Sequence, residues 1–223
     1  PGIDISYRPA THWKLFASWN KALRMPTFTD LYSDSPTQTG NLAIKPEETQ
    51  AVSVGVKYQN EFINASLNGF YHKGNNMIDW VMHSADEIYH STNLFKLDNM
   101  GVEASATLRF RQLGNENFFI DKLNVGYAYI YQNRHDDVEF FKSNYALEYL
   151  RHKFVARLDH RIWNKLNASW AFRWQNRMGS YLTYNADKTP AGLKPYPTYG
   201  LLDLKVCWKA EKYTIYAEAS NLL

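Results

Sequence analysis

The sequence predicts an all-β protein, an antiparallel transmembrane β-barrel with about ten strands in this chain. Side chains alternate between apolar and polar character along most of the 223 residues, which is the period of a strand with two unlike faces. The connections between these segments are short and long in turn. Aromatic residues gather near both ends of the segments, as at the two interfaces of a membrane barrel.

Each expected strand has its own alternating pattern. In His12–Ala22, Trp13, Leu15 and Trp19 share one face, and Lys14 and Asn20 lie on the other. The same alternation continues in order along the chain, and several segments approach the roughly 9–11 residues that a tilted strand needs to cross a bilayer. The further strands expected from it are Glu48–Tyr58, Phe62–Lys73, Gly101–Arg111, Leu123–Tyr131, Lys153–Arg161, Asn167–Gln175 and Leu201–Trp208.

The connections predict two unlike rims. Short ones fall at Arg8–Thr11, Gln59–Glu61, Gly114–Asn117, Trp163–Lys165 and Lys209–Lys212. Long ones fall at Leu23–Glu47, His83–Asn93, Asn133–Ala146 and Asn176–Pro197. Tight turns on one side and large loops on the other are typical of outer-membrane barrels. Gly74-Asn75-Asn76 is expected to be a bulge or kink where a long strand continues above the membrane.

The aromatic residues form two groups. One lies beside the short turns (Trp13, Tyr58, Phe62, Trp163, Trp208 and Tyr213), and the other lies toward the long loops (Trp19, Tyr71, Tyr131, Trp174 and Tyr199). Amphipathic rings are favoured where lipid meets water. The alternative is that they are core aromatics of a soluble β-sandwich, for example a carbohydrate-binding module, which the regular change between short and long turns disfavours.

Composition excludes several other classes. Net charge is +3 with both signs mixed along the chain, so no nucleic-acid footprint is visible. The single cysteine, Cys207, allows neither an internal disulfide framework nor a cysteine zinc cage. No apolar run approaches the roughly 20 residues of a membrane helix. Since the chain starts at Pro1 without an apolar leader, we expect it to be part of a larger protein.

The sequence gives only weak signals for catalytic or metal-binding residues. His83, Asp86, Glu87 and His90 cluster in one long connection, but their spacing is not that of a helix-face metal site, and a solvated loop is the preferred interpretation. His152 and His160 are expected to help fill a polar lumen wall. No G-x-S-x-G signature of a serine hydrolase is present. We therefore predict no catalytic residue, no metal ligand and no cofactor, with an outer-membrane lipase or protease as a remote alternative.

Several segments resemble one family. Arg24–Tyr32 (RMPTFTDLY) is similar to the R-x-P-[TS]-[FL]-x-[DE]-L-[YF] segment of TonB-dependent outer-membrane receptors, and Gly40–Glu47 (GNLAIKPE) to their G-N-P-x-L-K-P-E segment. Leu42 and Ile44 depart mildly from that pattern. The segments "NMGVEASATLRF", "YLRHKF" and "AEASNLL" resemble later family segments in the same order, with Leu150 where proline is common.

The resemblance implies a 22-stranded barrel filled by an N-terminal plug, in the outer membrane of a Gram-negative bacterium. Residues 1–223 would be the C-terminal portion of that barrel, without the plug and the closing strand. It also implies uptake of a metal chelate, such as ferric siderophore or cobalamin, with energy from the TonB–ExbB–ExbD system acting through the plug. Outer-membrane lipid and a surface lipoprotein are further expected partners, and we expect the protein not to be an enzyme.

Ligand contact is expected at the long loops and the upper inner wall. Aromatic rings give large contact area at low entropy cost, so the candidate residues are Tyr32, Trp80, Tyr89, Tyr181 and Tyr184. For each of them, packing within its loop is the simpler alternative. The inner charges Arg109, Arg157, Asp159 and Arg173 are expected to pair with the plug or with one another. A passive porin-like channel or an adhesin barrel is the alternative function.

Overall fold

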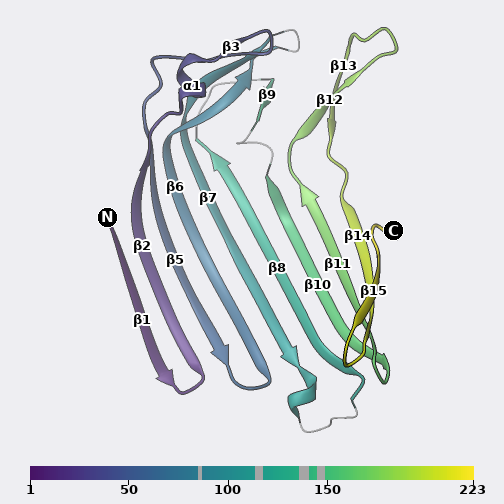
Figure 1. Cartoon of the computed structure of the whole chain (residues 1–223). Helices are drawn as coiled ribbons and strands as arrows, with labels where there is room; N and C mark the ends of the chain where they lie inside the picture. Colours follow the sequence, from purple (N-terminus) through teal and green to yellow (C-terminus); the bar gives the residue numbers. More distant parts are fainter. Residues whose placement is uncertain (85–86, 114–117, 136–140, 145–148) are drawn as a thin grey trace.

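Ten strands form one curved, open antiparallel sheet in the computed structural model, which describes residues 1–84, 87–113, 118–135, 141–144 and 149–223 (Figure 1). Along the sheet each strand pairs with the next, so that β1 and β15 are its two edges. The strands are β1 (Gly2–Ala10), β2 (Trp13–Arg24), β5 (Glu47–Gln59), β6 (Ile63–Met82), β7 (Tyr89–Arg109), β8 (Ile120–Arg134), β10 (Leu150–Trp163), β11 (Leu166–Arg177), β14 (Tyr199–Lys209) and β15 (Thr214–Ala219).

The remaining elements are short and lie mostly in the connections. They are α1 (Phe28–Tyr32), β3 (Asp34–Ser35), β4 (Gln38–Thr39), the 3-10 turn η1 (Phe110–Leu113), β9 (Lys142–Ser143), β12 (Ser180–Tyr184) and β13 (Pro190–Pro195). Within the described residues, no helix is long and apolar enough to cross a membrane. The predicted all-β class and the number of strands are confirmed.

The two rims differ as predicted, with one exception: the connection from β7 to β8 covers residues 110–119 and contains η1, and the short turn predicted at Gly114–Asn117 lies outside the described residues. Short connections, such as Ala10–Trp13 and Trp163–Leu166, lie at one end of the sheet, which we call the short-turn rim. The connections that contain α1, β3, β4, β9, β12 and β13 lie at the other end, the long-loop rim (Figure 1). This asymmetry is the one expected of an outer-membrane barrel.

One predicted loop is partly strand. His83–Asn93 was expected to be a long connection, but β6 continues to Met82 and β7 begins at Tyr89, so the two form a hairpin that rises above its neighbours. The predicted irregularity in Gly74-Asn75-Asn76 lies at the base of this extension, where Asn76 has a φ of 52°. Left-handed φ suits asparagine, whose short polar side chain tolerates it. The sequence prediction failed here because the polar residues at the tip of the hairpin hid the pairing between its two strands.

The two faces of the sheet have opposite character. One row of directly paired residues crosses eight strands and is apolar throughout: Tyr7, Leu15, Val56, Leu67, Ala104, Tyr127, Phe154 and Trp174. A row on the opposite face carries Asn64, Thr107, Asn124, Arg157, Ala171 and Asp203. Large apolar side chains such as Leu67 are exposed, as lipid-facing residues are. The polar face is the one that lines a barrel lumen.

Two aromatic rings on the polar face lie over glycines of neighbouring strands. A Cβ added to Gly55 would lie 2.7 Å from Cε1 of Phe16, and one added to Gly101 would lie 2.6 Å from Cζ of Phe70. Both distances are far below van der Waals contact, so only glycine admits the ring at these positions. The pairs fix the register locally by packing a ring into the space of a missing side chain.

The prediction for the two strand histidines is wrong. His152 shares the face of Phe154, and its Nδ1 lies 2.8 Å from the hydroxyl of Tyr127. His160 lies on that same face, and its Nε2 accepts a hydrogen bond from Nε1 of Trp170 at 3.1 Å. Both imidazoles belong to the apolar face rather than the lumen wall, because strand pleating gives residues 152, 154 and 160 the same side. Tyrosine and tryptophan supply the hydrogen bonds that make this placement tolerable.

Candidate functional site

The loop between β2 and β5 is closed at its two ends by one arginine. Nη1 of Arg24 lies 2.7 Å from Oε1 of Glu47, and its Nη2 lies 3.4 Å from Oδ2 of Asp30. Arg24 and Glu47 are also directly paired across β2 and β5. Both carboxylates are buried, whereas the Arg24 side chain is half exposed. A charged hydrogen bond with a buried acceptor is among the stronger side-chain interactions.

The start of helix α1 is fixed by the same aspartate. Thr27 is the N-cap: its hydroxyl accepts the backbone N–H of Asp30 at 3.1 Å, and the Asp30 carboxylate accepts the backbone N–H of Thr27 at 2.9 Å. This reciprocal pair is a capping box. Pro26 precedes the cap and has no N–H to satisfy. Asp30 therefore begins the helix and binds Arg24 at the same time.

The hairpin of β6 and β7 completes the cluster. Nε1 of Trp80 donates to Oδ1 of Asp30 at 3.3 Å, and the backbone N–H of Ile78 donates to Oε1 of Glu47 at 2.7 Å. Asp30, Glu47 and Trp80 are 4%, 6% and 6% exposed. We call Arg24, Asp30, Glu47 and Trp80 the loop anchor. It makes the first long loop and the hairpin one packed unit.

A second contact ties the loop to the base of the hairpin. The Asn93 side chain accepts the backbone N–H of Lys45 at 2.8 Å, and its amide donates to the carbonyls of Lys45 at 3.0 Å and of Asn76 at 2.7 Å. An asparagine can donate and accept in this way because its amide carries both functions. The carbonyl of left-handed Asn76 is thereby satisfied.

Two further segments of the long-loop rim pack on the same hairpin. β4 pairs with β7 in parallel, with Gln38 opposite Tyr89, and β9 pairs with β6, with Ser143 opposite Val81. The hydroxyl of Ser143 hydrogen-bonds to the buried carboxylate of Asp79. Since β9 belongs to the connection between β8 and β10, the hairpin collects residues from two other loops.

The five predicted ligand aromatics fall into two groups. Tyr32, Trp80 and Tyr89 lie on or beside the hairpin, whereas Tyr181 and Tyr184 lie on the separate hairpin of β12 and β13. Tyr32 is 56% exposed and stacks on Phe28 with ring centroids 4.7 Å apart. Trp80 is buried in the loop anchor. Tyr89 is half-buried, and its backbone N–H donates to the carbonyl of Thr37 at 3.0 Å.

The β12–β13 hairpin has its own packing. Tyr181 lies against Tyr196 with ring centroids 5.5 Å apart, and the guanidinium of Arg177 lies 4.6 Å from the centre of the Tyr196 ring. Tyr184 is 63% exposed near the tip. The turn beyond it is held by Asp187, whose carboxylate accepts both the hydroxyl of Thr189 at 2.6 Å and its backbone N–H at 3.0 Å. These bonds, the one from the Thr189 hydroxyl foremost, hold the pKa of the Asp187 carboxyl below its ordinary value.

The histidine cluster of the hairpin tip gives no metal geometry in the part that is described. His83 and His90 are exposed, and the carboxylate of Glu87 accepts the backbone N–H of His83 at 3.0 Å. Asp86 lies outside the described residues. Among the described residues, no group of three or more histidine, cysteine, aspartate or glutamate side chains is placed to hold a metal ion.

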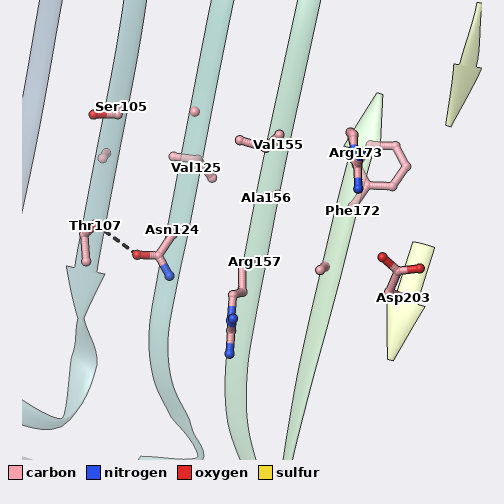
Figure 2. A pocket seen from close by; sticks show the side chains of 13 residues that line it. Ser105, Thr107, Asn124, Val125, Val155, Ala156, Arg157, Phe172, Arg173 and Asp203 are labelled. Carbon is pink, nitrogen blue, oxygen red and sulfur yellow. Dashed lines mark hydrogen bonds between the residues drawn. The ribbon is translucent and has the colours of Figure 1, made fainter. Parts of the chain in front are cut away.

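A pocket of about 410 Å³ lies lower on the polar face, midway along β7, β8, β10, β11 and β14 (Figure 2). On one side of the pocket, the hydroxyl of Thr107 donates a hydrogen bond to the side-chain oxygen of Asn124 at 3.0 Å. Arg173 and Asp203 stand on its other side, on neighbouring strands. The pocket has the size of a small-molecule site.

Sequence reasoning found the exposed aromatics but missed the polar residues that place them. The signal was available in the resemblance, since Arg24, Asp30 and Glu47 are three of the four charged positions in the two segments that match the family. Ile78, Asp79 and Asn93 gave no such signal, because their roles depend on the hairpin. Taken together, the rim offers a rigid, aromatic-bearing surface suited to non-covalent binding.

The chain matches one family model over nearly its whole length. Residues 1–222 match the family described as TonB dependent receptor-like, beta-barrel. Among curated proteins, the vitamin B12 transporter BtuB of Vibrio vulnificus is 25% identical over 104 residues, which cover 47% of this chain and 16% of that protein.

Solved structures give the same fold at low identity. The copper transporter OprC superposes with a TM-score of 0.73 at 16% identity, over 99% of this chain and 33% of its own. The ferric enterobactin receptor PfeA of Pseudomonas aeruginosa, solved with enterobactin, superposes with a TM-score of 0.71 at 19% identity, over 100% of this chain and 34% of its own. The siderophore receptor PirA of the same species superposes with a TM-score of 0.67 at 14% identity, over 100% of this chain and 36% of its own. The chain therefore spans about a third of the length of these structures.

Proposed function

This chain belongs to the TonB-dependent receptor-like β-barrel family, and from that membership we propose that residues 1–223 form the C-terminal portion of the barrel of an outer-membrane receptor. Receptors of this family are outer-membrane β-barrel proteins of Gram-negative bacteria. The proposed receptor takes up a metal chelate, a ferric siderophore or cobalamin being the leading candidates. Energy would come from TonB with ExbB and ExbD through a plug, and no covalent chemistry takes place.

The loop anchor is the observation that carries this proposal. A receptor that captures a scarce ligand gains affinity when its contact surface is already ordered before binding. Arg24, Asp30, Glu47 and Trp80 order the first loop against the hairpin.

The contact residues remain those proposed from the sequence. Tyr32 and Tyr184 have the exposed rings that direct contact requires. Tyr89 and Tyr181 are half-buried and would contribute ring edges. Trp80, being buried, would touch a ligand only if the loop anchor opens, and in its closed form it positions the loop that carries Tyr32.

The test is saturable binding to the purified receptor. Ferric siderophores and cobalamin are titrated separately, and quenching of tryptophan fluorescence is measured. We expect one of them to bind with a Kd on the order of nanomolar and to lose that affinity when the loop of residues 23–47 is deleted. If none binds and planar bilayers show steady open conductance, the importer proposal fails and the passive channel replaces it.

A further inference from the structure

The apolar face of the sheet carries a row rich in aromatic residues near its long-loop end. Directly paired residues on β2, β5, β6, β7 and β8 form this row: Trp19, Val52, Tyr71, Met100 and Tyr131. Rings of this kind mark the level at which lipid acyl chains give way to head groups. The next positions toward the long loops on this face therefore lie at head-group level.

Those next positions are polar and charged. Two residues further along each strand, about 7 Å beyond the aromatic row, the apolar face carries Lys21, Gln50, Lys73, Asp98 and Asn133. These strands lie inside the sheet, between its two edges. This side of them is turned away from the lumen, so a plug inside the barrel would not cover it.

Both carboxylates at this level already have partners. Nζ of Lys21 lies 3.0 Å from Oε2 of Glu48, and Nε2 of His135 lies 2.8 Å from Oδ2 of Asp98. The anions of this region are thus occupied by neighbours on the same face.

Two lysines beside them have no such partner. Lys73 and Lys96 are exposed, and neither forms an ion pair with any residue that the structure describes. In the register of β6 and β7, Lys96 is opposite Asn75, which is two residues from Lys73. Such diagonal neighbours on one face are about 7–8 Å apart, so two long lysine side chains can reach one anion.

A third cation stands at the start of β10, beyond β8. Nη2 of Arg151 lies 3.4 Å from the hydroxyl of Tyr149, and its guanidinium interacts electrostatically with Tyr129 and Tyr131 of the apolar face. Its buried Nε has no hydrogen-bond partner, and within the described ranges no carboxylate pairs with it. We call Lys73, Lys96 and Arg151 the outward cations.

The opposite end of the apolar face has a different character. The row that crosses β6, β7, β8, β10, β11 and β14 there consists of Ile63, Leu108, Leu123, Leu158, Trp170 and Leu204. The outward cations therefore belong to the long-loop side alone. This asymmetry fits a membrane in which the leaflet on that side has the more anionic head groups.

We propose that the outward cations bind the phosphate groups of a phosphorylated glycolipid in the outer leaflet of the outer membrane. Lys73 and Lys96 would share one phosphate, and Arg151 would bind another, since a guanidinium can donate two parallel hydrogen bonds to phosphate. The amides of Gln50 and Asn133 lie at the same level, where sugar hydroxyl groups would contact them. The acyl chains would run along the apolar face below the aromatic row.

The proposed lipid site is separate from ligand capture at the loops. It rests on the outer-membrane placement in the proposed function, but not on uptake of a chelate. None of the outward cations takes part in the loop anchor. A receptor that binds no chelate would still bind the glycolipid, so the two proposals fail separately.

Three lipids test the head-group chemistry on the purified full-length receptor in detergent. Bisphosphorylated lipid A carries phosphomonoesters, each with about −1.5 to −2 charge. Lipid A with both phosphates removed has the same sugars and acyl chains, and phosphatidylglycerol has one singly charged phosphodiester. Native mass spectrometry over a lipid titration measures each Kd. We expect saturable binding of bisphosphorylated lipid A and at least about tenfold weaker binding of the other two.

A triple variant then assigns the cations. Lys73→Gln/Lys96→Gln/Arg151→Gln should weaken binding of bisphosphorylated lipid A at least about tenfold, because each cation near an anionic surface contributes roughly fivefold. If this variant does not fold, Lys73→Gln/Lys96→Gln changes exposed side chains only and should weaken binding about fivefold or more.

The matched control removes three cations from the polar face of the same sheet. Lys14, Lys57 and Lys153 lie on that face, so Lys14→Gln/Lys57→Gln/Lys153→Gln has the same change in net charge. It should alter the Kd for bisphosphorylated lipid A by less than about twofold, because its cations do not face lipid. Lys14→Gln/Lys57→Gln is the corresponding control for the double variant.

Folding of every variant is checked by the heat-dependent shift of the barrel in gel electrophoresis. Equal binding of bisphosphorylated and dephosphorylated lipid A, or of lipid A and phosphatidylglycerol, would overturn the proposal. So would an equal loss of binding in the outward variants and their polar-face controls. A chelate titration on the same samples tests the proposed uptake independently.

Discussion

Arg24 and Glu47 stand at the two ends of one 22-residue loop, and their side chains meet with Nη1 and Oε1 2.7 Å apart. The same carboxylate oxygen accepts the backbone N–H of Ile78 in the hairpin. A single buried oxygen therefore takes part in both the ion pair at the ends of the loop and the contact with the hairpin. Because Arg24 and Glu47 are already paired in the ladder of β2 and β5, the ion pair reinforces a closure that the backbone makes.

Arg24→Gln should loosen this loop. The change removes the cation shared by two buried carboxylates, which costs about 1–3 kcal/mol; the cost stays below that of a fully buried pair because the Arg24 side chain is half exposed. Hydrogen exchange of the backbone N–H groups of Leu31 and Ile78, which donate to Thr27 and Glu47, should accelerate by about 5–150-fold. Unchanged exchange at both amides would show that the ion pairs do not hold the loop.

Lys21→Gln is the matched control for that variant. Lys21 pairs with Glu48 at 3.0 Å on the same two strands, but both side chains are well exposed. Exposed pairs contribute about 0–1 kcal/mol, so exchange at Leu31 and Ile78 should stay within about fivefold of wild type. An effect as large as that of Arg24→Gln would mean that general charge, rather than burial, governs the loop.

Trp80→Phe and Tyr32→Ala should separate positioning from contact. Trp80→Phe removes the N–H that satisfies Oδ1 of Asp30, so it should raise exchange at Leu31 as well as weaken chelate binding. Tyr32→Ala removes an exposed ring and should weaken chelate binding with exchange unchanged. Fluorescence titration and hydrogen exchange on the same samples measure both quantities. The reverse pattern would make Trp80 the contact residue.

Gly55→Ala should destabilise the barrel. The new methyl group would lie 2.7 Å from a ring carbon of Phe16 and 2.8 Å from the carbonyl oxygen of Leu67, and overpacking of this kind costs about 1–3 kcal/mol. Urea unfolding followed by tryptophan fluorescence measures the change. Phe16→Leu should recover part of it, but not the clash with the backbone of Leu67.

Gly69→Ala is the control for overpacking. Its nearest atom beyond the chain neighbours is the carbonyl oxygen of Gly101, 4.0 Å from the new methyl group. Its free energy of unfolding should stay within about 0.5 kcal/mol of wild type. If both alanines cost the same, the loss reflects the strand interior in general and not the ring of Phe16.

Acid should loosen the turn between β12 and β13 only at low pH. Because the bonds from Thr189 hold the pKa of the Asp187 carboxyl below its ordinary value, their stabilising effect is complete above the unfolded pKa of about 3.9. It is lost only as the pH falls through the lower, folded pKa. Carboxyl NMR titration should place the Asp187 midpoint below those of exposed aspartates, and Thr189→Ala should raise it. A midpoint at the ordinary value would contradict the turn geometry.

The alternation of apolar and polar residues predicted most of the fold, because successive side chains along a strand point to opposite faces of the sheet. It placed Trp13, Leu67 and Phe154 on the apolar side and Asn124 and Arg157 on the polar side, as the structure has them. It failed at the hairpin of β6 and β7, where both faces are covered by loops and alternation no longer reflects lipid and water. His152 was misplaced because polarity was given more weight than parity.

The candidate site was less predictable because it depends on contacts between distant loops. The exposed ring of Tyr32 was visible from composition, but the burial of Trp80 requires Asp30, fifty positions earlier, to reach it. The pairing of Asp79 with Ser143 spans sixty-four positions. No local pattern encodes such separations. The pocket at Arg173 and Asp203 likewise arises only from the register of five strands.

The hairpin of β6 and β7 also bears on how the rim would respond to immune or phage pressure. Residues of the hairpin core, such as Asp79 and Val81, are 1% exposed, and together with Ile78 and Trp80 they contact two other loops, so substitutions there would disturb all three at once. Within the described part of the chain, β12 and β13 form a separate two-stranded sheet, and the turn at their tip is held by the bonds between Asp187 and Thr189. Surface variation should therefore be tolerated best in the turn of residues 185–189, where an altered epitope leaves the loop anchor intact.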